Sequence, residues 1–522
     1  MLKKLHGRKL AVCLIGGAMY ALFSAFGWQA EHGGVIWAGG ALLVAALLVW
    51  PIAALLAVLL ERGYTRALRQ EKTFRAGRAF AFMLACYVPM FCVAFPGSFA
   101  YDVPYQLRQV VTGAYSTHHP LLHTLALGGL LQLGRALGDI NLGAALYTAL
   151  QMALLAGCFA LTCGSIARQS GARAAKRAAV FFALYPLNMV MAVNATKDVL
   201  FGGFFALTLA LLNEIQEKPS RGLALKIAAC GALAVMLRNN MAYAALVWLA
   251  ILTIGLRKAE KSAALAMLLA LAVGLCGNAA LKHATRAESG DMSEMLSWPI
   301  QQLARARLYD EDRLTDAEKE AIDELLPGEA WACYDPTISD PVKFEFDTQA
   351  FRADVKKYVG VWLSVGKKCA GTYLDATMAL TYPFFYPYRE YRVSGYYVQM
   401  GMSDAYDAGW CDFDPPESRS LFPRVLASLS WRFGAKGAMQ IPVVGWLFNM
   451  GVIVWTMLFF ALREMYWGRW RRFGTALLPV LLWGTFLLGP VMAGRYIYPF
   501  VCALPVLAAR PGRSVKEAAR HG

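Results

Sequence analysis

Charged residues are scarce in this sequence. Only 16% of the 522 residues are charged, whereas 58% are hydrophobic, and soluble domains usually contain about 25% charged residues. The chain repeatedly shows apolar runs that are long enough to cross roughly 30 Å of hydrocarbon. The composition therefore excludes an ordinary soluble protein and predicts an all-α polytopic membrane protein.

Several familiar motifs are also missing. The formal net charge of +16 comes without a nucleic-acid-binding motif or a basic face with interleaved aromatic residues, so we expect no nucleic-acid partner. The spacing of the eleven cysteines matches no zinc site. The N-terminal stretch "AVCLIGGAMYALFSAFGW" lacks a small-residue cleavage site, so we interpret it as a membrane span.

The apolar runs predict about twelve transmembrane helices. We place them at residues 9–29, 35–60, 78–96, 141–165, 177–193, 198–215, 222–237, 240–256, 262–281, 441–462, 473–493 and 496–509. The first two spans form an N-terminal addition (1–77) to a transmembrane core (78–281), and the last three belong to a C-terminal part (441–522).

The basic residues predict which connections face the cytoplasm. Seven connections and termini hold 28 of the 51 Lys and Arg residues, which places them, and both ends of the chain, inside the cell. Successive connections can alternate between the two sides of the membrane in this way only if residues 119–138, "HPLLHTLALGGLLQLGRALG", do not cross it. We predict a juxtamembrane helix on the outer surface there, with a true span as the alternative.

The composition changes sharply between residues 282 and 440. This segment holds 24 of the 35 acidic residues and helix-start signals such as "LTDAEKEAIDELL", in which Thr315 and Glu318 match a capping box. We predict an extracytoplasmic, mainly helical soluble domain. Two states of the cysteines are possible in that compartment. Cys411 forms a disulfide with either Cys333 or Cys369, or all three stay free thiols.

Polar residues cluster in "FPGSFAYDVPYQLRQVVTGAYSTHHPLLHT", which opens the first outer connection, residues 97–140. One interpretation is local: Asp102 caps the following helix and Arg108 neutralises it. The other interpretation is a functional site built around Asp102.

Four further charged residues favour a functional site. Lys197, Asp198, Arg238 and Arg495 each lie at the predicted outer end of a span, where an unpaired charge costs a few kcal/mol. One shared polar cavity explains them more simply than four separate ion pairs. Cations at the membrane boundary would hold the phosphate of a lipid, and an aspartate would remove the proton of an attacking hydroxyl.

Short motifs in this order resemble the GT-C superfamily of integral-membrane glycosyltransferases, which includes polyprenyl-phosphate-sugar-dependent mannosyltransferases and aminoarabinose transferases. The motifs are "PGSFAYD", "HHPLLHTL", "KD" and "RYIYP", and the resemblance covers residues 78–509. The segments "SWPIQQLARARLYDEDRLTDAEKEAIDELLP", "YDPTISDPVK" and "CAGTYLDATMALTYPFFYP" are closer to an uncharacterised bacterial group of membrane proteins within that superfamily.

The resemblance implies roles for particular residues. Asp102 takes the place of the catalytic base, and three cations take the place of donor phosphate ligands: Lys197, Arg238 and Arg495. Candidate supporting residues are Asp198, Arg108, His118, His119, Tyr101 and Tyr496. No ligand cluster here identifies a metal site, although some relatives use a divalent metal ion, so metal dependence is left open.

The resemblance also implies an activity and a location. It predicts an inverting transfer of a sugar from a polyprenyl-phosphate donor to a hydroxyl of an envelope glycan, lipid or protein, at the outer face of a bacterial cell membrane. The competing class is a flippase or transporter of a lipid-linked sugar. Against transport, the two halves of the chain show no internal repeat and no matching pair of broken spans.

Overall fold

The structure is a computed structural model that describes residues 2, 5–32, 38–62, 73–100, 102–253, 258–290, 292–388, 398, 400–402, 415–434 and 441–510. Within these ranges the protein is helical. Extended backbone pairs there only as isolated bridges, such as the one between Ser98 and Asn194. The predicted all-α class is therefore confirmed for the described part of the chain.

Six of the described helices are long and apolar enough to cross a membrane. They are α1 (Arg8–Glu31), α2 (Ala38–Arg62), α3 (Ala76–Ala94), α6 (Ile140–Ser170), α9 (Lys197–Glu217) and α12 (Lys258–Thr285). These helices identify a multi-pass membrane protein.

The other predicted spans also contain helices, but these are shorter. They are α7 (Ala172–Leu184), α8 (Pro186–Ala192), α10 (Arg221–Leu237), α11 (Asn239–Thr253), α21 (Met450–Tyr466), α22 (Trp470–Leu487) and α23 (Tyr498–Ala508). A total of twelve spans stays a prediction.

Two predicted spans differ from the observed helices. The span at 177–193 is broken between α7 and α8, because Pro186 has no amide hydrogen and disfavours helical geometry at Tyr185, whose ψ is 121°. The span at 441–462 begins late. Asn449 caps α21 by accepting a hydrogen bond from the Val452 amide, and the residues before it form the short 3₁₀ turn η7 (Val444–Leu447).

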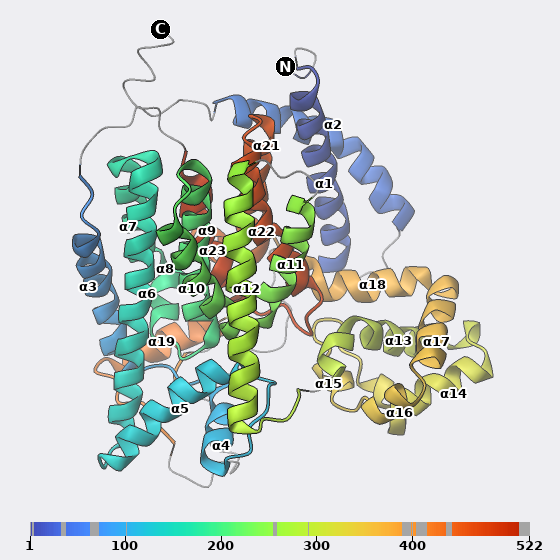
Figure 1. Ribbon diagram of the computed structural model, residues 1–522. Coiled ribbons are helices and arrows are strands. Elements are labelled where there is room, and N and C mark those ends of the chain that lie inside the picture. Colours follow the sequence, from blue (N-terminus) through green and yellow to red (C-terminus); the bar gives the residue numbers. More distant parts are fainter. Residues whose placement is uncertain are drawn as a thin grey trace.

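The long helices run side by side, and two shorter helices lie at one end of this bundle (Figure 1). Helix α9 is buried along most of its length and packs against α6, α10, α12, α22 and α23. Helices α4 (Val103–Thr112) and α5 (Leu121–Ala136) lie at the lower end in this view, and α5 runs obliquely to the bundle. The first residues of α9 point toward the same end.

A second hydrophobic core lies beside this lower end, within the predicted soluble domain. It is built from residues between Ile300 and Tyr373. The helices that supply it are α13 (Ser297–Tyr309), α14 (Asp316–Leu325), α15 (Asp340–Lys343), α16 (Thr348–Ala353), α17 (Val355–Lys368) and α18 (Ala370–Thr381), with the 3₁₀ turns η2 (Met292–Leu296) and η4 (Pro327–Cys333); the turn η3 (Glu311–Arg313) lies between α13 and α14. The predicted capping box at α14 is confirmed, since Thr315 and Glu318 satisfy each other's backbone amides.

The chain then returns to the main bundle. Phe384, in η5 (Tyr382–Phe384), and Tyr388 are buried in the core of the bundle, and α19 (Pro423–Gly434) packs on α3. Cys333 and Cys369 are both free thiols, and Cys411 lies outside the described residues.

Glycines fix the position of α5 against α6. A Cβ atom added at Gly143 would lie 2.3 Å from the carbonyl oxygen of Leu130 and 3.1 Å from the Cα of Gly134. The two backbones therefore approach as closely as small residues allow. This contact holds α5, which carries His123, on the start of α6.

Gly143→Ala tests this close approach. The new methyl group meets a backbone oxygen that cannot rotate away, so we expect a loss of about 1–3 kcal/mol of stability, seen as a lower thermal unfolding midpoint in detergent. The matched control is Gly157→Ala in the same helix, where a Cβ meets nothing within 4 Å. The control should be neutral or slightly stabilising, and equal effects of the two substitutions would contradict the packing described.

Candidate functional site

Two loops that are distant in sequence are joined at the lower end of the bundle. The amide of Ser98 donates to the carbonyl of Val193 at 2.8 Å, and the amide of Ala195 donates to the carbonyl of Ser98 at 2.8 Å. This pairing sets the connection after α3 against the turn before α9. As a result Asp102, which precedes α4, lies beside Lys197, the first residue of α9.

The carboxylate of Asp102 binds two cations. Lys197 Nζ lies 2.5 Å from Asp102 Oδ2, and Arg495 reaches both carboxylate oxygens, at 3.0 Å from Nη1 and 3.3 Å from Nη2. Arg495 comes from the 3₁₀ turn η8 (Gly494–Ile497) that leads into α23. The Asp102 side chain is 21% exposed, more than its partners at 14% and 11%, so solvent reaches the anion at the centre of the cluster.

A second ion pair lies deeper in the same cluster. Arg238, at the end of α10, pairs with Asp198, whose side chain is fully buried. Thr196 donates to Asp198 as well, and Arg495 Nε lies 3.9 Å from the same carboxylate. The Arg238 guanidinium also lies against the rings of Phe486 and Tyr496, at 4.3 and 4.5 Å from their centroids.

The predicted convergence of the charged residues is therefore observed. Asp102, Lys197, Asp198, Arg238 and Arg495 come from four separate segments and form one cluster. Three cations face two carboxylates, which leaves one surplus positive charge. Phe486, which sequence reasoning missed, and the predicted Tyr496 provide aromatic faces for Arg238.

The surrounding charges set the protonation of Asp102. Burial alone would raise the pKa of this carboxyl, but the positive charges of Arg495 and Lys197 hold the pKa well below its ordinary value. The group is ionised at neutral pH. Because its folded pKa is depressed, the stability it contributes is present above its unfolded pKa, about 3.9, and is lost as the pH falls through the folded pKa.

His119 and His118 lie next to the cluster in different environments. His119 Nδ1 is 3.7 Å from Asp102 Oδ2, and its side chain is buried. Burial lowers the pKa of His119 to about 3, although the Asp102 charge acts to raise it, so the imidazole is neutral at pH 7. His118 is exposed, and its ring meets that of His119 edge-on at 4.6 Å.

The local interpretation of Asp102 is wrong. Its side chain makes no capping hydrogen bond to α4, and among the described residues its carboxylate contacts Lys197, Arg495 and His119 rather than Arg108. Arg108 is exposed and lies six residues after Asp102. Because each helical residue turns the chain by about 100°, Arg108 lies on a different face of α4 from Asp102. Arg108 is therefore no member of the cluster, and Tyr101 lies outside the described residues.

A buried hydrogen-bonded chain supports the turn before Lys197, and sequence reasoning missed it. Gln106 and His123 are in contact at 2.9 Å, Tyr147 reaches His123 at 2.8 Å, and the Tyr147 hydroxyl also contacts Gln151 at 3.1 Å. The Gln151 amide then donates to the carbonyls of Ala192 and Asn194. A glutamine in the middle of an apolar span was the signal available in the sequence.

The described side chains do not fit a resident metal ion. No group of three or more His, Cys, Asp and Glu residues converges in the described part of the chain. The two site carboxylates are already paired with cations. We therefore derive no step through a metal ion.

These features define a class: a multi-pass helical membrane protein with a cluster of paired charges where several of its helices begin or end. The chain belongs to the family described as "Family of unknown function (DUF6020)", whose model matches residues 105–521. Lys197, Arg238 and Arg495 lie inside the matched part, and Asp102 lies three residues before it. No curated protein and no solved structure matches the chain.

The buried pair yields a stability prediction. Asp198→Asn leaves the Arg238 guanidinium buried without its counter-charge, so we expect a loss of about 3–5 kcal/mol, measured as a fall in thermal unfolding midpoint in detergent. The double variant Asp198→Asn/Arg238→Met removes both charges and should recover much of that loss. Additive losses in the double variant would show that the two residues do not act as a pair.

Proposed function

We propose that this protein is a membrane glycosyltransferase of the GT-C type. It moves a sugar from a polyprenyl-phosphate donor to a hydroxyl of an envelope glycan, lipid or protein at the outer face of a bacterial cell membrane. One observation carries the proposal: a partly exposed, ionised Asp102 sits among three cations that carry one surplus positive charge, where helices of a membrane bundle end. The motifs around these residues resemble those of the GT-C superfamily, which supports the proposal.

The cluster matches the needs of a phosphate leaving group. Arg495 and Lys197 are the more exposed cations, and Arg495 presents two guanidinium nitrogens in a fork that suits a phosphate as well as a carboxylate. Arg238 is held in place by Asp198 and by two aromatic rings. Asp198 thus acts through Arg238 as a positioning residue and is not a second base.

The ion pairs of Asp102 bear on its role as a base. A carboxylate bound to two cations is a weak base, because its negative charge is already stabilised. A donor phosphate that draws Lys197 and Arg495 toward itself weakens those pairs and raises the basicity of Asp102. Asp102 therefore becomes a competent base only when the donor is present.

The reaction proceeds in a single displacement. The acceptor hydroxyl oxygen attacks the anomeric carbon while Asp102 takes its proton, and the bond from that carbon to the phosphate oxygen breaks on the opposite face. The bonding electrons leave with the polyprenyl phosphate, whose charge is stabilised by Lys197, Arg238 and Arg495. The configuration at the anomeric carbon is inverted, and no covalent enzyme intermediate forms.

Asp102→Asn tests the catalytic role directly. The substitution keeps the shape of the side chain and removes its ability to take a proton, so we expect transfer to fall by about 10²–10⁴-fold. The measurement is transfer of radiolabelled sugar from polyprenyl-phosphate sugars to a membrane extract, at equal amounts of folded protein, with donor binding measured in parallel.

The matched control is Asp139→Asn. Asp139 lies at the start of α6, 40% exposed, and pairs with Arg419 at the surface, so this variant should transfer at the wild-type rate. The competing function is a flippase. If wild type and Asp102→Asn move donor across liposomes equally and neither forms product, the catalytic proposal fails.

A further inference from the structure

A groove lies at the opposite end of the bundle from Asp102. It has a volume of about 650 Å³ and is lined by residues of α7, α21 and α23. From α7 come Ala174, Arg177, Ala178 and Phe181, which recur every three or four residues and so share one face of the helix. Its size falls in the range of sites for small organic ligands, roughly 300–1,000 Å³.

The groove combines hydrocarbon walls with a cationic end. Phe181, Phe460 and Leu504 supply apolar surface, whereas Arg177 and Arg510 are the two charged residues of the lining. Both arginines belong to the basic segments that the sequence places in the cytoplasm. An occupant therefore needs an anion at one end and hydrocarbon along the rest.

Residues next to the groove add to the positive charge. Arg463 is buried, pairs with Glu464 at 2.6 Å and donates to the carbonyl oxygens of Leu507 and Ala508. Arg469 shares Glu464 at 3.2 Å, and Arg510 feels the charges of the same two residues. Two guanidinium groups thus share one carboxylate, which leaves a surplus of positive charge beside Arg510.

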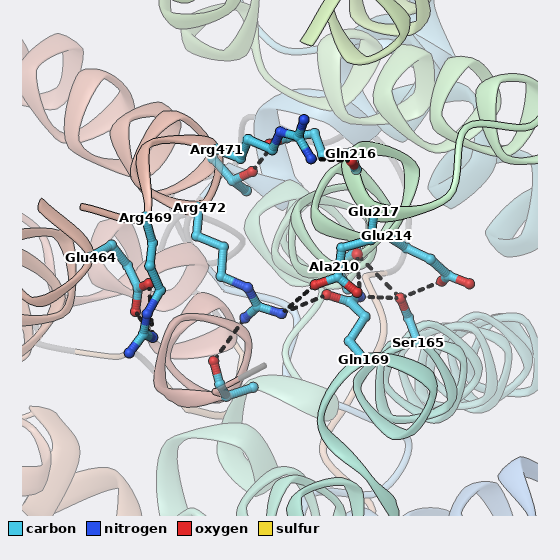
Figure 2. Close-up of polar contacts among 12 residues, drawn as sticks. Ser165, Gln169, Ala210, Glu214, Gln216, Glu217, Glu464, Arg469, Arg471 and Arg472 are labelled. Atoms are coloured by element: carbon cyan, nitrogen blue, oxygen red, sulfur yellow. Dashed lines mark hydrogen bonds and ion pairs between the residues drawn. The ribbon is translucent and has the colours of Figure 1, made fainter. Parts of the chain in front are cut away.

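A polar network fixes the helices beneath this end. Arg472 donates to the carbonyl of Ala509 and to the side chains of Gln169 and Glu217. Figure 2 shows these contacts joining α6, α9 and the start of α22, and it shows Arg469 against Glu464. These contacts tie the helices that meet at the cationic end of the groove.

We propose that this groove binds an anionic phospholipid of the inner leaflet, with its phosphate at Arg177 and Arg510 and an acyl chain along the apolar wall. Basic pockets between transmembrane helices on the cytoplasmic side are suited to such headgroups. A second copy of this chain fits less well, because its own segments at that end are strongly basic and would repel the arginines. The site is separate from the charged cluster and independent of the proposed activity.

The test is native mass spectrometry of the full-length protein titrated with phosphatidylglycerol and with phosphatidylcholine. Wild type should retain phosphatidylglycerol preferentially. Arg177→Gln/Arg510→Gln should weaken that binding by roughly tenfold, because the headgroup loses two cationic partners whose attraction is partly screened by salt. Ala178→Trp should also weaken it, because the indole fills the apolar wall.

The matched control is Arg78→Gln/Arg221→Gln, which removes two exposed arginines from the same end of the bundle outside the groove. This control should retain phosphatidylglycerol at wild-type strength. An equal loss of phosphatidylglycerol binding in both double variants would show that the lipid responds only to general surface charge, which would overturn the proposal. Three other results would overturn it as well. Inorganic phosphate alone could displace the lipid, or the protein could prefer polyprenyl phosphate to phosphatidylglycerol. The third is a dimer mass in wild type that Ala178→Trp abolishes.

Discussion

The Asp102 carboxylate between Lys197 and Arg495 is the interaction on which this end of the bundle, where α4 and α5 lie, depends. It ties the connection after α3 to the start of α9 and to the turn before α23. Charges at a membrane boundary are costly when isolated, so each member of the cluster stabilises the others. The carboxylate lies between the two cations and offsets the repulsion between them.

Backbone and buried polar contacts bring these charges together. The pairing of Ser98 with the turn at residues 193–195 sets the two loops side by side, and Gln151 holds the carbonyls of the same turn from within α6. Arg238 is placed by Asp198 and two aromatic rings. The site is thus a product of long-range packing in a helical bundle, with short polar segments at the ends of its helices.

Much of this arrangement could be predicted from the sequence, because apolar runs and basic connections follow directly from the physics of a bilayer. The positions of the long helices were predictable for that reason, and the capping box at Thr315 was predictable from its local pattern of a threonine followed by a glutamate three residues later. The break before Pro186 was missed because a proline can also be accommodated within a span. Arg108 does not pair with Asp102 because of the helix face on which it lies. Gln151 supports the turn before Lys197 through contacts between residues far apart in the sequence. No local sequence pattern specifies either feature.

The central claim is that Asp102 and a lipid phosphate compete for Lys197 and Arg495, and binding of polyprenyl phosphate to Asp102→Asn tests it most directly. Removing the competing carboxylate should free both cations, so the account predicts that this variant binds polyprenyl phosphate more tightly than wild type, by roughly tenfold. Lys197→Gln and Arg495→Gln should bind it more weakly. An Asp102→Asn variant that binds polyprenyl phosphate no better than wild type would contradict the claim.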